Sequence, residues 1–117
     1  MITTLQCVNA TQFIDAVERD CLSFKIGKTG QSKEQRLAQY KADPNEEDYQ
    51  GIEFVFSGNK QDVDDMESFL IDYYKDNPKC DNKRDGEVSN NDKMADDEDV
   101  YHVYVVWNEK NQRKEIK

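Results

Sequence analysis

The stretch LSFKIGKT, residues 22–29, alternates apolar and polar side chains and decides how this chain is expected to fold. Alternation with a period of two is typical of a β-strand that is buried on one face. Gly30 follows and ends the strand, and Ser32 with Gln35 three residues later forms a capping-box pattern that starts a helix. The segment therefore predicts a strand, a turn and a helix in immediate succession.

The same criteria, applied outward from this unit, predict the other elements of the chain. Predicted strands cover residues 2–8, 52–56 and 101–107, and predicted helices cover residues 11–19 and 61–75. The last strand divides its side chains between two faces, with Val103, Val105 and Trp107 on one and His102, Tyr104 and Val106 on the other. We therefore expect a single α+β domain over residues 1–117, with a small sheet of three or four strands flanked by helices.

The chain is acidic, with a formal net charge of −9. Such a charge repels nucleic-acid phosphates at long range, whereas a typical DNA-binding protein is basic. A compact basic face can still form, because five cationic side chains fall in one short stretch: Lys25, Lys28, Lys33, Arg36 and Lys41. A protein that mimics nucleic acid would also be acidic, so that alternative stays open.

Simple sequence features exclude several classes of protein. The N-terminal residues lack the basic and apolar regions of a signal peptide, and no apolar run is long enough to span a membrane. The three cysteines have no CxxC spacing, so we expect reduced thiols. Residues 81–99 carry almost no apolar side chains, which predicts a mobile acidic loop. We expect an intracellular protein that has no membrane partner.

Two pairs of motifs carry more information than the pattern of helices and strands. The first pair is FKIGKT, residues 24–29, followed in the next helix by QRLAQY, residues 35–40. The second pair is MESFLI, residues 66–71, followed by CDNKRDG, residues 80–86. Their order and spacing resemble the GIY-YIG nuclease superfamily, particularly its phage and large-virus versions. In that family a strand ending in YIG or KIG precedes a helix with an arginine, and a later helix presents a metal-binding glutamate, often followed by an asparagine.

The resemblance implies a metal-dependent endonuclease that hydrolyses phosphodiester bonds, with nucleic acid, in the first place DNA, as its partner. Arg36 would steady the phosphate, and Glu67 would hold Mg²⁺ or Mn²⁺ as cofactor. A fixed guanidinium and a divalent cation both stabilise the charge that builds on phosphate oxygens in the transition state. The residues expected to bind nucleic acid are Lys28, Lys33, Lys41 and Asn82.

The tyrosines of the two motifs that give the family its name are missing from their expected places. Residues 2–8 contain no tyrosine, with Thr3 near the expected position, and Lys25 replaces the tyrosine of the second motif. Lys25 can contact phosphate, or act as a base if its pKa is depressed. Tyr40 is a second candidate for a catalytic role, since it lies one turn after Arg36 on the same helix face. The alternative is a catalytically inactive member of the fold, which binds nucleic acid without cutting it or acts as an acidic decoy for a protein partner.

Overall fold

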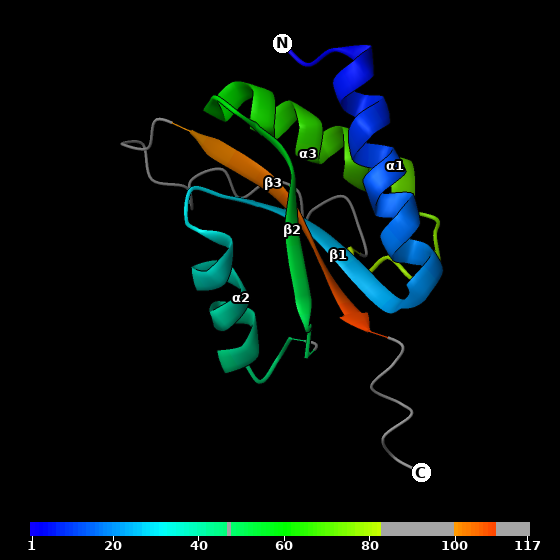
Figure 1. Cartoon of the computed structure of the whole chain (residues 1–117), viewed down its shortest axis with the longest axis vertical. Helices are drawn as coiled ribbons and strands as arrows, with labels where there is room; N and C mark the ends of the chain where they lie inside the picture. The colour runs from blue at the N-terminus through cyan, green and yellow to red at the C-terminus, as the bar shows by residue number, and fades with distance from the viewer. Residues whose placement is uncertain (47, 83–99, 110–117) are drawn as a thin grey trace.

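Helices and strands alternate along the part of the chain that the computed structural model describes, which is residues 1–46, 48–82 and 100–109. The elements are α1 (Thr4–Asp20), β1 (Cys21–Thr29), α2 (Lys33–Ala42), β2 (Gly51–Gly58), α3 (Lys60–Tyr74) and β3 (Tyr101–Glu109). Figure 1 shows the strands crossing the middle of the molecule, with helices on either side of them. The predicted α+β class is confirmed. No helix in these ranges has the length and apolar character needed to cross a membrane.

The strands form one antiparallel sheet in which the last strand of the chain is central, in the order β1-β3-β2. Each of the two outer strands therefore pairs with β3. Along the β1–β3 ladder, Gly27 lies opposite Tyr104 and Lys28 lies opposite Val103. The FKIGKT stretch is thus an edge strand whose neighbour comes from the far end of the described chain.

Each face of the sheet carries its own hydrophobic cluster. The larger cluster lies under α1 and α3 and includes Ile14, Phe24, Ile26, Leu70, Val103 and Val105. The smaller cluster lies under α2 and consists of Tyr40, Tyr49, Tyr104 and Val106. Figure 1 shows α2 on one side of the sheet and the other two helices on the opposite side. Because neighbouring side chains of a strand point to opposite faces, Gly27 faces α2 whereas Lys28 faces α3.

Most of the predicted elements are present. The predicted strands 22–29, 52–56 and 101–107 correspond to β1, β2 and β3, and the predicted helix 61–75 corresponds to α3. The capping box at the start of α2 is also confirmed, because Ser32 and Gln35 exchange hydrogen bonds between side chain and backbone at 3.1 and 3.2 Å. Most of the predicted acidic loop, residues 83–99, lies outside the described residues.

The predicted strand over residues 2–8 is wrong, because these residues begin a helix. Thr3 is the N-cap of α1 and forms a capping box with Gln6, which fixes the first helical turn. The apolar side chains of this segment do not share one buried face of a strand, since Leu5 is 67% exposed. α1 therefore extends the predicted helix 11–19 back to Thr4, and the sheet has three strands within the described residues.

Candidate functional site

Arg36 is held in place by the side chains around it on the α2 face of the sheet. Its Nε donates to Tyr104 Oη at 2.9 Å, and its Nη1 donates to Gln39 Oε1 at 2.6 Å. The guanidinium carbon lies 4.9 Å from the centre of the Tyr40 ring and 5.7 Å from that of Tyr104, within the range of cation–π attraction. Two elements far apart in the sequence, α2 and β3, thus fix one half-buried guanidinium.

The two tyrosines beside Arg36 also contact each other. Tyr40 Oη and Tyr104 Oη are 2.8 Å apart, and the rings meet edge to face. Burial raises the pKa of Tyr40 well above its ordinary value, and the contact with Tyr104 raises it further, so Tyr40 is a neutral phenol. Burial lowers the pKa of Arg36, but the two tyrosines raise that pKa by more, so the guanidinium stays charged. We call Arg36, Tyr40 and Tyr104 the arginine–tyrosine cluster.

Gly27 provides the space that Tyr104 occupies. A methyl group at Gly27 would lie 2.3 Å from Tyr104 Oη and 2.4 Å from its Cζ. Tyr104 is 1% exposed and belongs to the central strand, so its ring has no room to retreat. The backbone of Gly27 is not in the left-handed region. The glycine of the FKIGKT stretch is therefore required by the tyrosine that crosses it.

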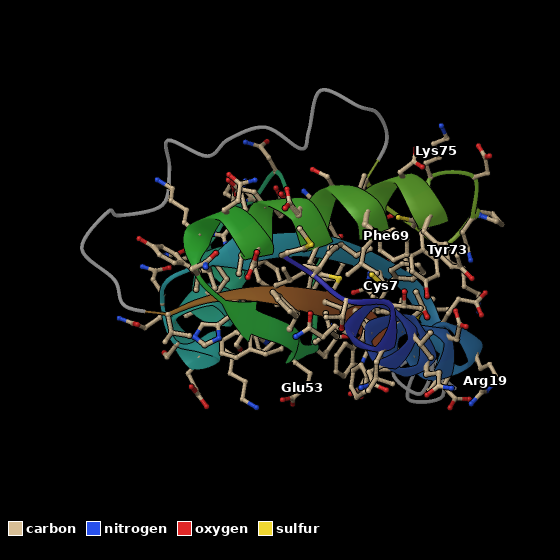
Figure 2. All side chains as sticks on the ribbon, turned by 90° about the horizontal axis from the view of Figure 1, so that it is seen from above. Cys7, Arg19, Glu53, Phe69, Tyr73 and Lys75 are labelled. Atoms are coloured by element: carbon tan, nitrogen blue, oxygen red, sulfur yellow. The ribbon has the colours of Figure 1, made fainter. Side chains whose placement is uncertain are left out.

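Arg36 differs from three predicted phosphate-binding lysines because it has no acidic partner among the described residues. Within residues 1–46, 48–82 and 100–109, no carboxylate forms an ion pair with its guanidinium. The lysines pair as Lys25–Glu46 at 3.4 Å, Lys28–Asp64 at 2.8 Å and Lys33–Glu53 at 2.8 Å. Glu53 points away from α3, as Figure 2 shows. Lys41 is exposed on the last turn of α2. The predicted cationic stretch is therefore largely neutralised by carboxylates, and it does not form a continuous basic face.

Glu67 lies on α3 and is buried against the sheet, with 5% of its surface exposed. Lys28 Nζ is 3.4 Å from Glu67 Oε1 and 2.8 Å from Asp64 Oδ1. The longer contact is an ion pair without good hydrogen-bond geometry, and Glu67 Oε1 has no hydrogen-bond partner among the described residues. Burial raises the pKa of Glu67 to about 7; Lys28 lowers the pKa but does not cancel the effect of burial, and Asp64 raises it. We call these three residues the lysine–acid cluster.

Asp64 and Glu67 offer the oxygen ligands that Mg²⁺ and Mn²⁺ prefer. They are three residues apart on α3, so their carboxylates lie on the same side of the helix. Mg²⁺ commonly takes one or two carboxylates and keeps several waters, and Glu67 Oε1, which makes no hydrogen bond among the described residues, is suited to such a role. No group of three or more His, Cys, Asp or Glu side chains suited to a metal occurs in the described part of the chain. The described residues of this cluster therefore offer two carboxylates to a divalent ion, and water would have to supply its other ligands.

The structure brings Lys25 and Tyr40 next to Arg36 but places Glu67 elsewhere. Lys25 Nζ lies 5.9 Å from the centre of the Tyr40 ring. Glu67 is carried by α3, on the opposite face of the sheet from α2. The arginine–tyrosine cluster and the lysine–acid cluster are connected through β1. Gly27 of this strand contacts Tyr104, and the next residue, Lys28, contacts Glu67. β1 therefore separates the two clusters, and the outer side of this strand is bonded to Cys80 and Asn82.

Asn82 has a structural role at this edge. Its Oδ1 accepts from Ile26 N at 2.8 Å, and its Nδ2 donates to Ile26 O at 3.0 Å, so the side chain acts as one further step of the β-ladder. The residue is 3% exposed. A buried amide with these two bonds already made is not presented to a phosphate, so the structure does not place Asn82 among surface contacts to nucleic acid.

Two residues of these clusters were absent from the sequence-based prediction. Tyr104 was assigned to the correct face of its strand, but its position beside Arg36 depends on the pairing of β3 with β1. Asp64 was visible from its spacing, since an acid three residues before Glu67 shares its helix face. The place of Asp64 beside Glu67 can therefore be predicted from the sequence. The place of Tyr104 beside Arg36 cannot, because it depends on the pairing of strands that are far apart in the sequence.

The fold and its side chains define a small α+β protein with a fixed arginine on one face of an antiparallel sheet and a buried glutamate on the other. Comparisons with protein-family models, with curated proteins and with solved structures find no match to this chain. Its function is therefore inferred from these residues and from the motifs that contain them.

The raised pKa of Glu67 makes stability depend on pH. The folded state holds this proton up to a pH of about 7, whereas the unfolded chain releases it near 4.5. The folded state therefore binds more protons between these values, and stability falls as pH rises through about 7. We expect the free energy of unfolding of the wild type, compared with Glu67→Gln, to fall by about 2–3 kcal/mol between pH 4.5 and 8, measured by urea denaturation.

The control for this measurement is Asp65→Asn, which removes an exposed carboxylate from the same helix. Its pH dependence should follow that of the wild type. Equal slopes for the wild type and Glu67→Gln would contradict the assignment of the raised pKa to Glu67.

Proposed function

We propose that this chain is an endonuclease of the GIY-YIG type, which hydrolyses phosphodiester bonds of nucleic acid, DNA in the first place, with Mg²⁺ or Mn²⁺. The observation that carries the proposal is that the charged side chain of Arg36 is held in a fixed position. In a chain with a net charge of −9, this guanidinium is fixed by two tyrosines and has no carboxylate partner within the described residues. A charge that is positioned but not neutralised is suited to an anionic ligand.

The role proposed for Arg36 is to hold a phosphate and stabilise the charge that develops on it. Its guanidinium has five N–H donors, of which Nε and one on Nη1 are engaged by Tyr104 and Gln39. The remaining donors can bind phosphate oxygens. Because the tyrosines already fix the group, little reorganisation accompanies the reaction. Lys25, 5.9 Å from the Tyr40 ring centre, adds positive charge on the same face, although Glu46 balances it in part.

We assign to Tyr104 the tyrosine role that residues 2–8 do not fill. Tyr104 Oη accepts from Arg36 Nε, and the neutral Tyr40 can donate to it across 2.8 Å. In the mechanism that the motifs imply, a tyrosine accepts the proton of the attacking water, directly or through another water, which requires its phenolate form. The Arg36 guanidinium and the Tyr40 hydroxyl would stabilise that phenolate at Tyr104. Tyr40, whose pKa is raised well above its ordinary value by burial, stays a neutral donor to Tyr104.

Glu67, together with Asp64, would hold the divalent ion, which supplies a positive charge for the phosphate and an acidified water. Support for this assignment is the buried Glu67 Oε1 that lacks a hydrogen bond in the described structure. A substrate that contacts both clusters would have to pass around β1, whose outer side is bonded to Cys80 and Asn82.

A second candidate function is binding of nucleic acid without cleavage. The observation that favours it is the placement of Arg36 and Glu67 on opposite faces of the sheet, together with the pairing of Lys25, Lys28 and Lys33 with carboxylates. In that case Arg36 would still bind a phosphate.

The test is cleavage of supercoiled plasmid and of single-stranded DNA by the purified chain in Mg²⁺ and in Mn²⁺. We expect cleavage that EDTA stops and that Glu67→Gln abolishes, because the amide removes the anionic metal ligand while keeping the size of the side chain. Asp65→Asn, an exposed change on the same helix, should cut like the wild type. DNA binding with no cleavage in either metal would instead favour the second candidate.

A further inference from the structure

Lys28 is buried in an unusual setting for a lysine. Its side chain is 6% exposed, and its ammonium lies 2.8 Å from Asp64 Oδ1 and 3.4 Å from Glu67 Oε1. Lysine is almost never this buried unless it is paired with opposite charge. The ammonium comes from β1 and both carboxylates come from α3, so the packing of the helix on the sheet brings the three groups together. The Lys28 ammonium therefore supplies the positive charge that both Asp64 and Glu67 contact.

A divalent ion held by the same carboxylates would occupy the surroundings of this ammonium. The two cations would then lie within a few ångströms of each other in a buried setting, where like charges repel strongly. Two carboxylates carry at most two negative charges, which an ammonium and a divalent ion together exceed. The lysine–acid cluster therefore has enough negative charge to balance the ammonium or the divalent ion, but not both.

We propose that Lys28 is an internal cation that occupies the position of the divalent ion between Asp64 and Glu67, so that the metal binds only when the ammonium leaves. The proposal rests on the metal assigned to Glu67 under the proposed function, and it adds a lysine that sets the affinity for that metal. It follows from the geometry of the cluster, in which the ammonium contacts both proposed ligands and Glu67 Oε1 has no hydrogen bond among the described residues.

The experiment measures Mn²⁺ bound to the full chain from the electron paramagnetic resonance signal of free Mn²⁺. Lys28→Met keeps most of the length of the side chain and removes the charge, and we expect it to bind Mn²⁺ at least roughly tenfold more tightly than the wild type. Lys28→Arg retains the charge and should bind no more tightly than the wild type. Lys75→Met removes an exposed lysine that is paired with the exposed Asp72 at the end of α3, and it controls for net charge. Its affinity should equal that of the wild type.

A second readout is thermal unfolding, which keeps the test valid if the variant is unstable. In EDTA, Lys28→Met should melt below the wild type, because the buried Glu67 and the partly exposed Asp64 lose their counter-charge. Mn²⁺ should raise its melting temperature by more than it raises that of the wild type, since a tighter ligand stabilises the folded state more. If Lys28→Met is unfolded in EDTA, we expect Mn²⁺ to refold it. Failure to refold, or an affinity equal to or weaker than that of the wild type, overturns the proposal.

The result of the Mn²⁺-binding experiment can be distinguished from that of the cleavage assay. A chain that does not cut DNA but gains Mn²⁺ affinity in Lys28→Met contradicts the nuclease and supports the internal cation. A chain that cuts DNA in Mg²⁺ but gains no affinity in Lys28→Met supports the nuclease and overturns the internal cation.

Discussion

Arg36→Lys is expected to lower the rate of DNA cleavage by about a thousandfold, as the loss of a fixed transition-state donor does in other enzymes. Lysine keeps the positive charge but has no planar fork of donors, and it cannot donate to Tyr104 while also binding a phosphate at two points. It also loses the stacking of the guanidinium on the Tyr40 ring. The measurement is the single-turnover cleavage rate of a labelled DNA with the protein in excess.

The matched control is Arg19→Lys, the same substitution at an exposed arginine near the end of α1 (Figure 2). It should cut at the wild-type rate. The dissociation constant for the same DNA, measured by fluorescence anisotropy, shows whether Arg36 acts on binding or on the chemical step. If Arg36→Lys cleaved DNA at a rate within a few-fold of that of the wild type, Arg36 would no longer support the proposed function.

Local patterns were sufficient to predict most helices and strands of this chain. The alternation in residues 22–29 and the Ser32–Gln35 capping box depend on neighbours in sequence, and both are present in the structure. The strand predicted over residues 2–8 is wrong for an equally local reason. Its apolar and β-branched residues favour a strand, but the Thr3–Gln6 capping box starts a helix there.

The candidate site was only partly predictable, because its geometry depends on pairings that are distant in sequence. Arg36 and Glu67 were found from their motifs, but the faces they occupy follow from how α2 and α3 pack on the sheet. Tyr104 meets Arg36 because β3 inserts between β1 and β2, and no local pattern specifies that order. Asn82 was expected at a phosphate, yet its amide completes the hydrogen bonding of the β1 backbone, which only the course of the chain after α3 determines.

Gly27→Ala is the second change for which we expect a large effect, because it acts on the same cluster without removing any of its groups. The added methyl would lie 2.3 Å from Tyr104 Oη, and the buried ring cannot move away without disturbing Tyr40. We expect a loss of about 1–3 kcal/mol in the free energy of unfolding, which is typical of overpacking. Cleavage should fall about a hundredfold, since Arg36 loses the partner that orients it. Urea denaturation and the single-turnover rate measure the two effects.

The double variant Gly27→Ala/Tyr104→Leu separates packing from chemistry. Leucine removes the atoms that the new methyl would meet, so Gly27→Ala should cost less stability in the Tyr104→Leu background than in the wild type. Cleavage should not recover, because Tyr104→Leu also removes the hydroxyl that accepts from Arg36 Nε and contacts Tyr40. An equal cost of Gly27→Ala in both backgrounds would contradict the close approach of Tyr104 to Gly27. Recovered stability accompanied by recovered cleavage would show that packing at Gly27 matters but that the Tyr104 hydroxyl does not.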